Sequence, residues 1–193
     1  MTNIFTSPEN RPFFSELLRK REAGINSLIN NLKIADVKED EKFVQTATRI
    51  KNSVLLQKVE FGDPRFVDHQ FEDKPLNIQQ QLIGGMSRNH YVHEILFPFT
   101  GDTMLFDHAP NEFSRSSSDR GLILPGFNNL RVYVDLPELN PTRAIVEAQG
   151  LLSLTMQFVS RNNAAVDSWT TIVSQTIDHL LELKREELIK IFG

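Results

Sequence analysis

The sequence predicts an α+β fold: an N-terminal helix pair, an antiparallel sheet of about four or five strands, and long C-terminal helices packed on one face of that sheet. Three observations support this prediction. Apolar residues recur every three or four positions near both ends of the chain, which is typical of amphipathic helices. In the middle of the chain, apolar and polar residues alternate with the period of two that is typical of strands. Two of these alternating runs flank a short turn that contains glycine.

The first residues, 1–11, are polar and predict a flexible leader, so a single domain is predicted over residues 12–193. A proline at the start of the first apolar stripe suits the first turn of a helix. Asp36 and Glu39 have the spacing of a capping box and predict the start of a second helix. The short polar connection predicts that the two helices are antiparallel. The predicted inward faces are Phe14, Leu18, Arg21, Ile25, Leu28 and Leu32 in the first helix and Phe43, Ala47, Ile50 and Val54 in the second.

The central segment 90–107, HYVHEILFPFTGDTMLFD, predicts two strands joined by a tight turn. Gly101 and Asp102 lie at the centre of this turn, and Gly101 is expected to adopt the positive φ that such a turn requires. A single helical turn is expected within residues 75–89. Further strands are expected at 66–71, 122–124 and 130–134. On the first strand of the central pair, one face holds Tyr91, His93, Ile95, Phe97 and Phe99, and the other holds Val92, Glu94 and Leu96.

The C-terminal region predicts two helices. Asn140 and Pro141 form an N-cap and a first-turn proline, and the helix that they begin is expected to reach about Arg161. The pair Asn162-Asn163 is expected to interrupt it, and a last helix then follows. Only part of the apolar stripe on this last helix can rest on a small sheet, so the stripe is predicted to be the main surface for a protein partner or a second copy. The stripe consists of Trp169, Val173, Ile177, Leu180, Leu188 and Ile191.

The composition excludes several classes of function. The chain has no cysteine, which removes disulfides, thiolate metal sites and cysteine nucleophiles. Its formal net charge of −4 argues against nucleic-acid binding, which usually needs a dense basic face. Neither a signal peptide nor an apolar run of about 18 residues is present, so a cytoplasmic location away from membranes is predicted. Phosphate-binding loops and serine-nucleophile elbows are also missing from the sequence, and no cofactor is expected.

The histidines offer one alternative, a metal site. His90 and His93 fall on opposite faces of a strand, so they should not share a metal ion. A zinc site that the tertiary fold assembles from His69, His93 and His108, with Asp102, remains an open alternative.

A second alternative is a metal-dependent hydrolase that uses Asp63, Glu72 and Lys74. An acidic residue at a bend, followed by acid-x-lysine on the next strand, resembles the metal-dependent nuclease core. In that core two carboxylates hold Mg²⁺ and the lysine helps to activate water. The sequence departs from this pattern because Pro64 follows the first acid instead of preceding it, and because Pro75 ends the strand directly after the lysine.

The segment after the central strand is similar to a poorly characterised bacterial domain. That domain has an aromatic-x-aromatic-x-Gly-Asp turn, then a Leu-Phe pair, a proline and an aromatic-Ser loop. The matching residues here are Phe97, Phe99, Gly101, Asp102, Leu105, Phe106, Pro110, Phe113 and Ser114. The resemblance covers residues 28–188 and implies an accessory or sensing module, in some cases joined to effectors of bacterial defence. It implies no catalytic residues. The expected function is therefore a non-catalytic interaction or sensor module that associates with itself or with a partner through its long helices.

Overall fold

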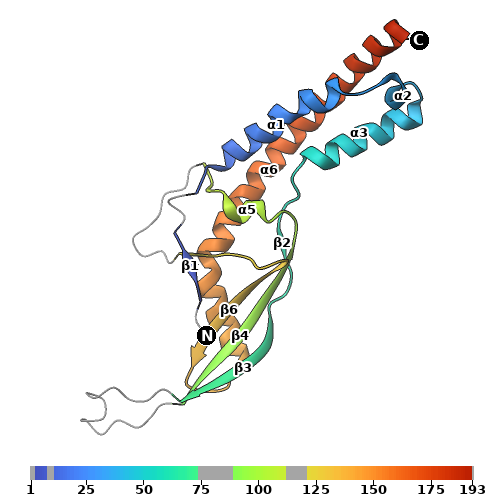
Figure 1. Ribbon diagram of the computed structural model, residues 1–193. Coiled ribbons are helices and arrows are strands. Elements are labelled where there is room, and N and C mark those ends of the chain that lie inside the picture. The colour runs from blue at the N-terminus through green and yellow to red at the C-terminus, as the bar shows by residue number, and fades with distance from the viewer. Residues whose placement is uncertain (1–2, 8–10, 74–88, 112–120, 193) are drawn as a thin grey trace. The chain divides into compact units, whose positions relative to one another are not determined.

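The computed structural model describes residues 3–7, 11–73, 89–111 and 121–192. The fold is mixed α+β, with an N-terminal helix pair, antiparallel strands and a long C-terminal helix, as predicted (Figure 1). The chain divides into two compact units, and each is built from three stretches of sequence. We call them the sheet unit (Met1–Asn10, Val59–Phe106 and Ser114–Val159) and the helical unit (Arg11–Lys58, Asp107–Phe113 and Ser160–Gly193). The prediction of one domain over residues 12–193 did not distinguish these units.

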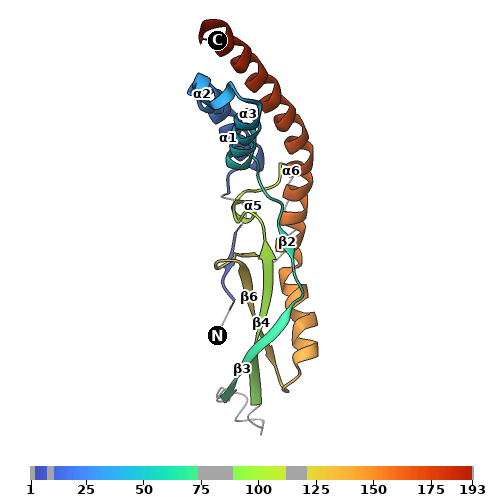
Figure 2. The ribbon, with the colours of Figure 1, turned by 90° about the vertical axis from the view of Figure 1, so that its right-hand side faces the viewer.

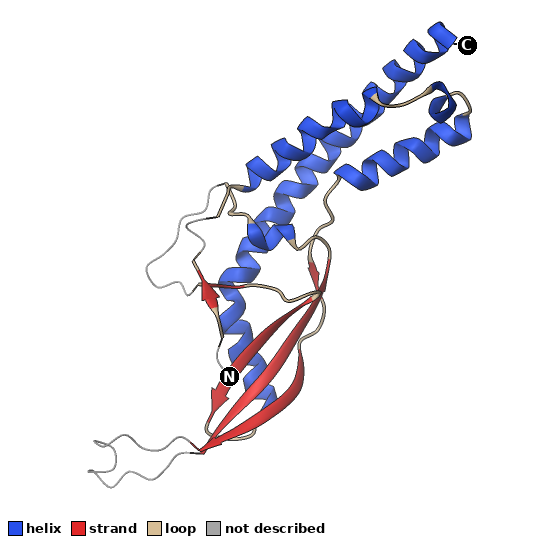
Figure 3. Ribbon diagram, in the orientation of Figure 1, coloured by secondary structure: helices blue, strands red, loops and turns tan. Residues whose placement is uncertain are grey.

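The sheet unit is organised around the central strand β4 (Asn89–Thr100), which forms antiparallel pairs with three other strands (Figure 3). They are β3 (Arg65–Asp73), β6 (Asn129–Leu136) and the short β2 (Glu60–Phe61), which pairs with the last two residues of β4. A separate two-stranded sheet pairs β1 (Phe5–Thr6) with β5 (Leu122–Ile123). The helical turn expected within residues 75–89 falls almost wholly outside the described residues.

The predicted inward face of β4 is correct. His93, Ile95, Phe97 and Phe99 are each 4% exposed or less, and Tyr91 is half-buried. The first part of α6 (Pro141–Phe192) runs along the sheet (Figure 2). Its buried side chains in this unit include two small ones one turn apart, Ala144 and Ala148, which allow a helix to approach a sheet closely. The larger Leu152 follows one turn later and is also buried.

The leader predicted over residues 1–11 contains regular structure in the part that the structure describes. This part contains β1 and, in addition, a contact made by Asn3. The side chain of Asn3 bonds to both the N–H and the carbonyl of Tyr133. Asn3 Nδ2 donates to Tyr133 O at 2.7 Å, and Tyr133 N donates to Asn3 Oδ1 at 2.8 Å. One amide side chain thus satisfies a donor and an acceptor of β6, which an adjoining strand would otherwise do.

The prediction of a second strand in the central hairpin is wrong. Residues Met104–Asp107 form the short helix α5. Leu105 N donates to Asp102 O and Phe106 N donates to Thr103 O, so the turn winds directly into a helix. Leu105 and Phe106 are both buried, whereas neighbouring residues of a strand would face opposite sides. Gly101 does adopt a positive φ, of 98°, but it ends β4 and does not join two paired strands.

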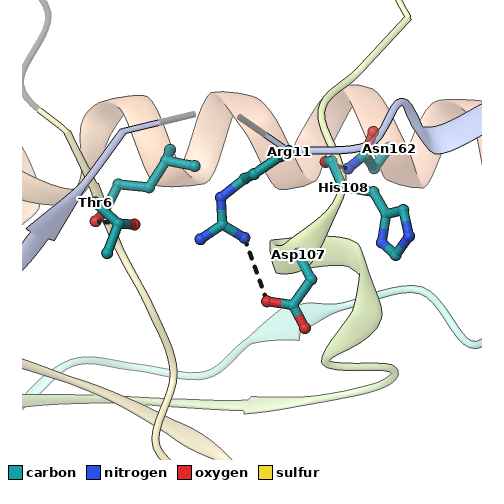
Figure 4. A network of polar contacts seen from close by, with 6 residues as sticks. Thr6, Arg11, Asp107, His108 and Asn162 are labelled. Carbon is teal, nitrogen blue, oxygen red and sulfur yellow. Dashed lines mark hydrogen bonds and ion pairs between the residues drawn. The ribbon is translucent and has the colours of Figure 1, made fainter. Parts of the chain in front are cut away.

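The predicted break at Asn162 is also wrong, because α6 is a single helix of 52 residues. Asn162 is 1% exposed, and its Nδ2 donates to the carbonyl oxygen of His108 at 2.9 Å (Figure 4). A buried amide with a partner does not need to compete for the backbone of its own helix, so the helix continues. At the other end the prediction is correct, since Asn140 Oδ1 accepts the backbone N–H of Arg143 at 3.0 Å. None of the described helices combines the length and apolar character needed to cross a membrane.

The helical unit contains α1 (Phe14–Asn30), α2 (Ile34–Val37), α3 (Asp40–Val54) and the C-terminal part of α6. The helix pair is as predicted, but α1 is rotated relative to its predicted inward face. Phe14, Ile25 and Leu32 are buried as predicted. Leu17 and Ile29, which were not predicted, are buried as well, whereas Leu28 is 42% exposed. Asp36 accepts the backbone N–H of Lys33 at 2.8 Å and therefore caps α2, not the longer helix that was predicted.

The N-terminus of α1 is capped by residues distant in sequence. Its N-cap residue, Phe13, has no polar side chain. Phe14 N donates to Ala109 O at 2.7 Å, and Ser15 N donates to Asn111 Oδ1 at 3.0 Å. The segment that follows α5 thus satisfies two of the backbone donors that a helix leaves unpaired at its start.

We predict that Gly101→Val lowers the free energy of unfolding by about 1–3 kcal/mol, because valine is strained at a φ of 98°. Chemical denaturation followed by circular dichroism measures the change. Gly150→Ala is the matched control, because a Cβ added to this glycine of α6 meets no atom within 4 Å and alanine favours the helix. The two substitutions should change stability in opposite directions. A Gly101→Val protein as stable as the wild type would contradict the assignment.

Candidate functional site

An open hollow of about 480 Å³ lies in the helical unit, at the end of α1 and along α3. We call it the α1–α3 hollow. Its lining comes from three successive helices and the connection after α1, so the helix pair predicted from the sequence builds it. The lining residues are Leu28, Asn31, Leu32, Asp36, Arg49, Ile50 and Ser53.

Three of the side chains that line the hollow are apolar. Leu32 and Ile50 are buried, while Leu28 is 42% exposed. The sequence pattern placed Leu28 on the inward face of its helix, but the rotation of α1 moves it outward. The hollow thus presents apolar surface that a ligand or a partner side chain can cover.

Among the charged groups at the hollow, Arg49 is available for binding. Its side chain is exposed, and no hydrogen bond or ion pair joins it to another residue that the structure describes. The carboxylate of Asp36 already accepts a bond from the backbone of Lys33. Ser53 is also engaged, since its hydroxyl donates to Ile50 O at 2.8 Å and its carbonyl accepts Arg21 Nη1 at 3.0 Å.

The apolar stripe on α6, predicted as an association surface, mostly packs within the helical unit. Trp169, Val173, Ile177 and Leu188 are buried, Leu180 is half-buried, and Ile191 is 60% exposed. The indole N–H of the tryptophan donates to Glu22 Oε1 of α1 at 2.6 Å. The pattern correctly identified an apolar stripe, and four of its six side chains pack in the core of this unit. Leu180 and Ile191 keep exposed surface, and association through this helix stays a prediction.

Two ion pairs tie the same part of α6 to α3. Lys51 Nζ lies 2.7 Å from Asp178 Oδ2, and Arg185 pairs with Asp40. The guanidinium of Arg185 also lies over the ring of Phe43, 4.6 Å from its centroid. Exposed pairs of this kind contribute little each to stability, but they fix which faces of two helices meet.

The structure does not bring the predicted zinc ligands together. The described residues contain no group of three histidine, aspartate or glutamate side chains that could hold a metal ion. His93 is buried in the sheet unit with both ring nitrogens hydrogen-bonded, and His69 is exposed on β3. His108 belongs to the helical unit, where its ring packs edge-on against Phe14 at 6.4 Å between centroids. Asp102 lies in the turn after β4 and joins no such group.

His90 and His93 do lie on opposite sides of β4, as predicted. His90 Nδ1 lies 2.8 Å from Asp135 Oδ1, whereas His93 points into the core.

The predicted hydrolase residues are separated by the strand itself. Asp63 is exposed at the bend before β3, and Glu72 is near the far end of that strand. An extended strand rises about 3.3 Å per residue, so the two positions are roughly 20 Å or more apart and cannot share a metal ion. Lys74 lies outside the described residues.

No family model matches the chain, and no curated protein or solved structure is significantly similar to it. The α1–α3 hollow therefore has to be interpreted from its own chemistry.

We predict that Leu188→Asp destabilises the protein by roughly 3 kcal/mol or more, because it places an unpaired carboxylate in a packed core. Ile191→Asp, on the same helix but exposed, should change stability by only about 0.5 kcal/mol. Thermal denaturation with light scattering checks both variants. If Leu188→Asp instead kept its melting temperature and dissociated an oligomer, the stripe would be an association surface after all.

Proposed function

We propose that this protein is a non-catalytic interaction module that docks a partner protein through its helical unit. The α1–α3 hollow is the observation that supports this proposal. It sets accessible apolar surface from Leu28 beside the guanidinium of Arg49, which pairs with none of the residues that the structure describes. Grooves between helices commonly receive the apolar face of an amphipathic helix.

The chemistry of the hollow defines its occupant. An apolar side chain of the partner would cover Leu28 and Ile50, and a carboxylate near that side chain would meet Arg49. Arginine binds a carboxylate through two parallel hydrogen bonds, which gives direction as well as charge. We therefore propose an acidic amphipathic helix of a partner protein as the occupant.

The charged side chains of the hollow favour binding over catalysis. Only Asp36 and Arg49 among its lining residues carry a charge, and the carboxylate of Asp36 serves the start of α2. An activated nucleophile must be hydrogen-bonded to a base, whereas the hydroxyl of Ser53 in this lining donates to the carbonyl of Ile50 at 2.8 Å.

Two synthetic amphipathic helices test the proposal, one with leucine anchors flanked by glutamates and its counterpart with lysines. We predict that the full chain binds the glutamate peptide roughly three- to tenfold more tightly, because a reversal of charge at an exposed ion pair changes binding by about this much. Arg49→Glu should reverse the preference. Leu28→Asp should weaken both peptides at least about tenfold through the loss of apolar contact. Fluorescence anisotropy measures all of these affinities.

Val44→Asp is the matched control, because Val44 is exposed on α3 and does not line the hollow. This variant should bind both peptides like the wild type. Equal affinity for the two peptides, or an unchanged preference in Arg49→Glu, would contradict the proposal. Sedimentation of the chain alone examines the other occupant, a second copy. Self-association that Leu28→Asp abolishes and Val44→Asp preserves would replace the partner helix with that copy.

A further inference from the structure

His93 is a fully buried ionisable group that the proposed function does not use. It lies in the middle of β4, in the sheet unit, and is 0% exposed. Its Nδ1 lies 2.9 Å from the carbonyl oxygen of Tyr91, and its Nε2 lies 3.0 Å from the backbone N of Asn140. Both ring nitrogens therefore have a backbone partner.

These two partners define the protonation state of the ring. The carbonyl of Tyr91 can only accept, so Nδ1 must carry the hydrogen. The backbone N–H of Asn140 can only donate, so Nε2 must present its lone pair. Of the three forms of an imidazole, only the neutral form with hydrogen on Nδ1 makes both bonds.

The bond to Asn140 holds the start of α6 on the sheet. Asn140 Oδ1 accepts the N–H of Arg143 at 3.0 Å, and Asn140 O accepts the N–H of Ala144 at 3.0 Å. His93 thus anchors the residue that caps the helix. A second proton on the ring would place one donor, Nε2–H, opposite another, the N–H of Asn140, so the hydrogen bond between them would be lost. It would also bury a cation beside the positive end of a helix dipole.

The groups around His93 offer no compensation for a positive charge. On β3, the ring of Phe66 lies 6.0 Å from that of His93, and His69 is the register partner of His93. On β4 itself, the ring of Tyr91 lies 6.5 Å away. On β6, its register partner is the apolar Val134.

At the start of α6, the nearest charged groups are already engaged with each other and with Asn140. Glu138 accepts the side-chain amide of Asn140 at 3.3 Å and pairs with Arg143 at 3.6 Å. Among the described residues, no carboxylate bonds to the ring of His93.

We propose that His93 is a pH-sensitive latch within the sheet unit. In its neutral form it holds Asn140, and with it the first turn of α6, against β4. In its protonated form it releases them, so the helix start opens in acid. All residues of the latch belong to the sheet unit, whereas those of the α1–α3 hollow belong to the helical unit.

Hydrogen exchange and NMR on the full chain test the latch. Long-range ¹H–¹⁵N spectra at neutral pH should show hydrogen on Nδ1 of His93. Protection of the Arg143 and Ala144 amides, corrected for intrinsic rates, should be lower at about pH 5 than at about pH 7.5. The loss is expected because a proton on Nε2 removes the lone pair that accepts the N–H of Asn140.

Two glutamine variants show whether the pH dependence comes from His93 or from a neighbouring histidine. His93→Gln offers a carbonyl that can accept the N–H of Asn140 and does not titrate, so protection should no longer depend on pH. His69→Gln removes the neighbouring exposed imidazole and should keep the wild-type response. Hydrogen on Nε2 at neutral pH, or equal wild-type protection at the two pH values, would overturn the proposal. An acid response that persists in His93→Gln would do the same. If His93→Gln does not fold, the wild-type measurements alone decide.

Discussion

The continuity of α6 is the constraint on which both units depend. One helix supplies Ala144, Ala148 and Leu152 to the core of the sheet unit, and Trp169, Val173 and Ile177 to the core of the helical unit. A break near the middle of this helix would change which of its side chains face each core. The hydrogen bond from Asn162 to the carbonyl of His108 removes the local reason for such a break.

The elements that the sequence predicted correctly are those with a local physical cause. Alternation predicted the inward face of β4, because that face is covered along most of its length. Asn140 and Pro141 predicted the start of α6, because an N-cap acts within one helical turn. Two of the errors have distant causes: the partner of Asn162 is 54 positions away, and Asn3 bonds to a residue 130 positions away. Periodicity and propensity contain no information about such pairs.

The α1–α3 hollow was not predictable for a related reason. Leu28 falls on the apolar stripe of its helix, so its spacing indicated a core residue. Its exposure depends on how far α1 rotates when it packs, and Leu17 and Ile29 determine that rotation by being buried instead. Arg49 belongs to no motif, and its availability follows from the absence of an ion-pair or hydrogen-bond partner among the described residues, since Asp36 in the same hollow bonds to the backbone of Lys33. The stripe on α6 was recognised, but its partners are other helices, which a reading of one helix at a time does not reveal.

The single tryptophan and the two tyrosines lie in different units, so their spectroscopic signals report on different units. The single tryptophan, Trp169, is buried in the helical unit, where its indole bonds to Glu22. Both tyrosines, Tyr91 and Tyr133, belong to the sheet unit. Tryptophan emission therefore reports on one core, while tyrosine absorbance reports on the other. The protein contains an intrinsic optical test of cooperativity: coincident transitions would mean that the two units unfold together, and separated transitions that each has its own stability.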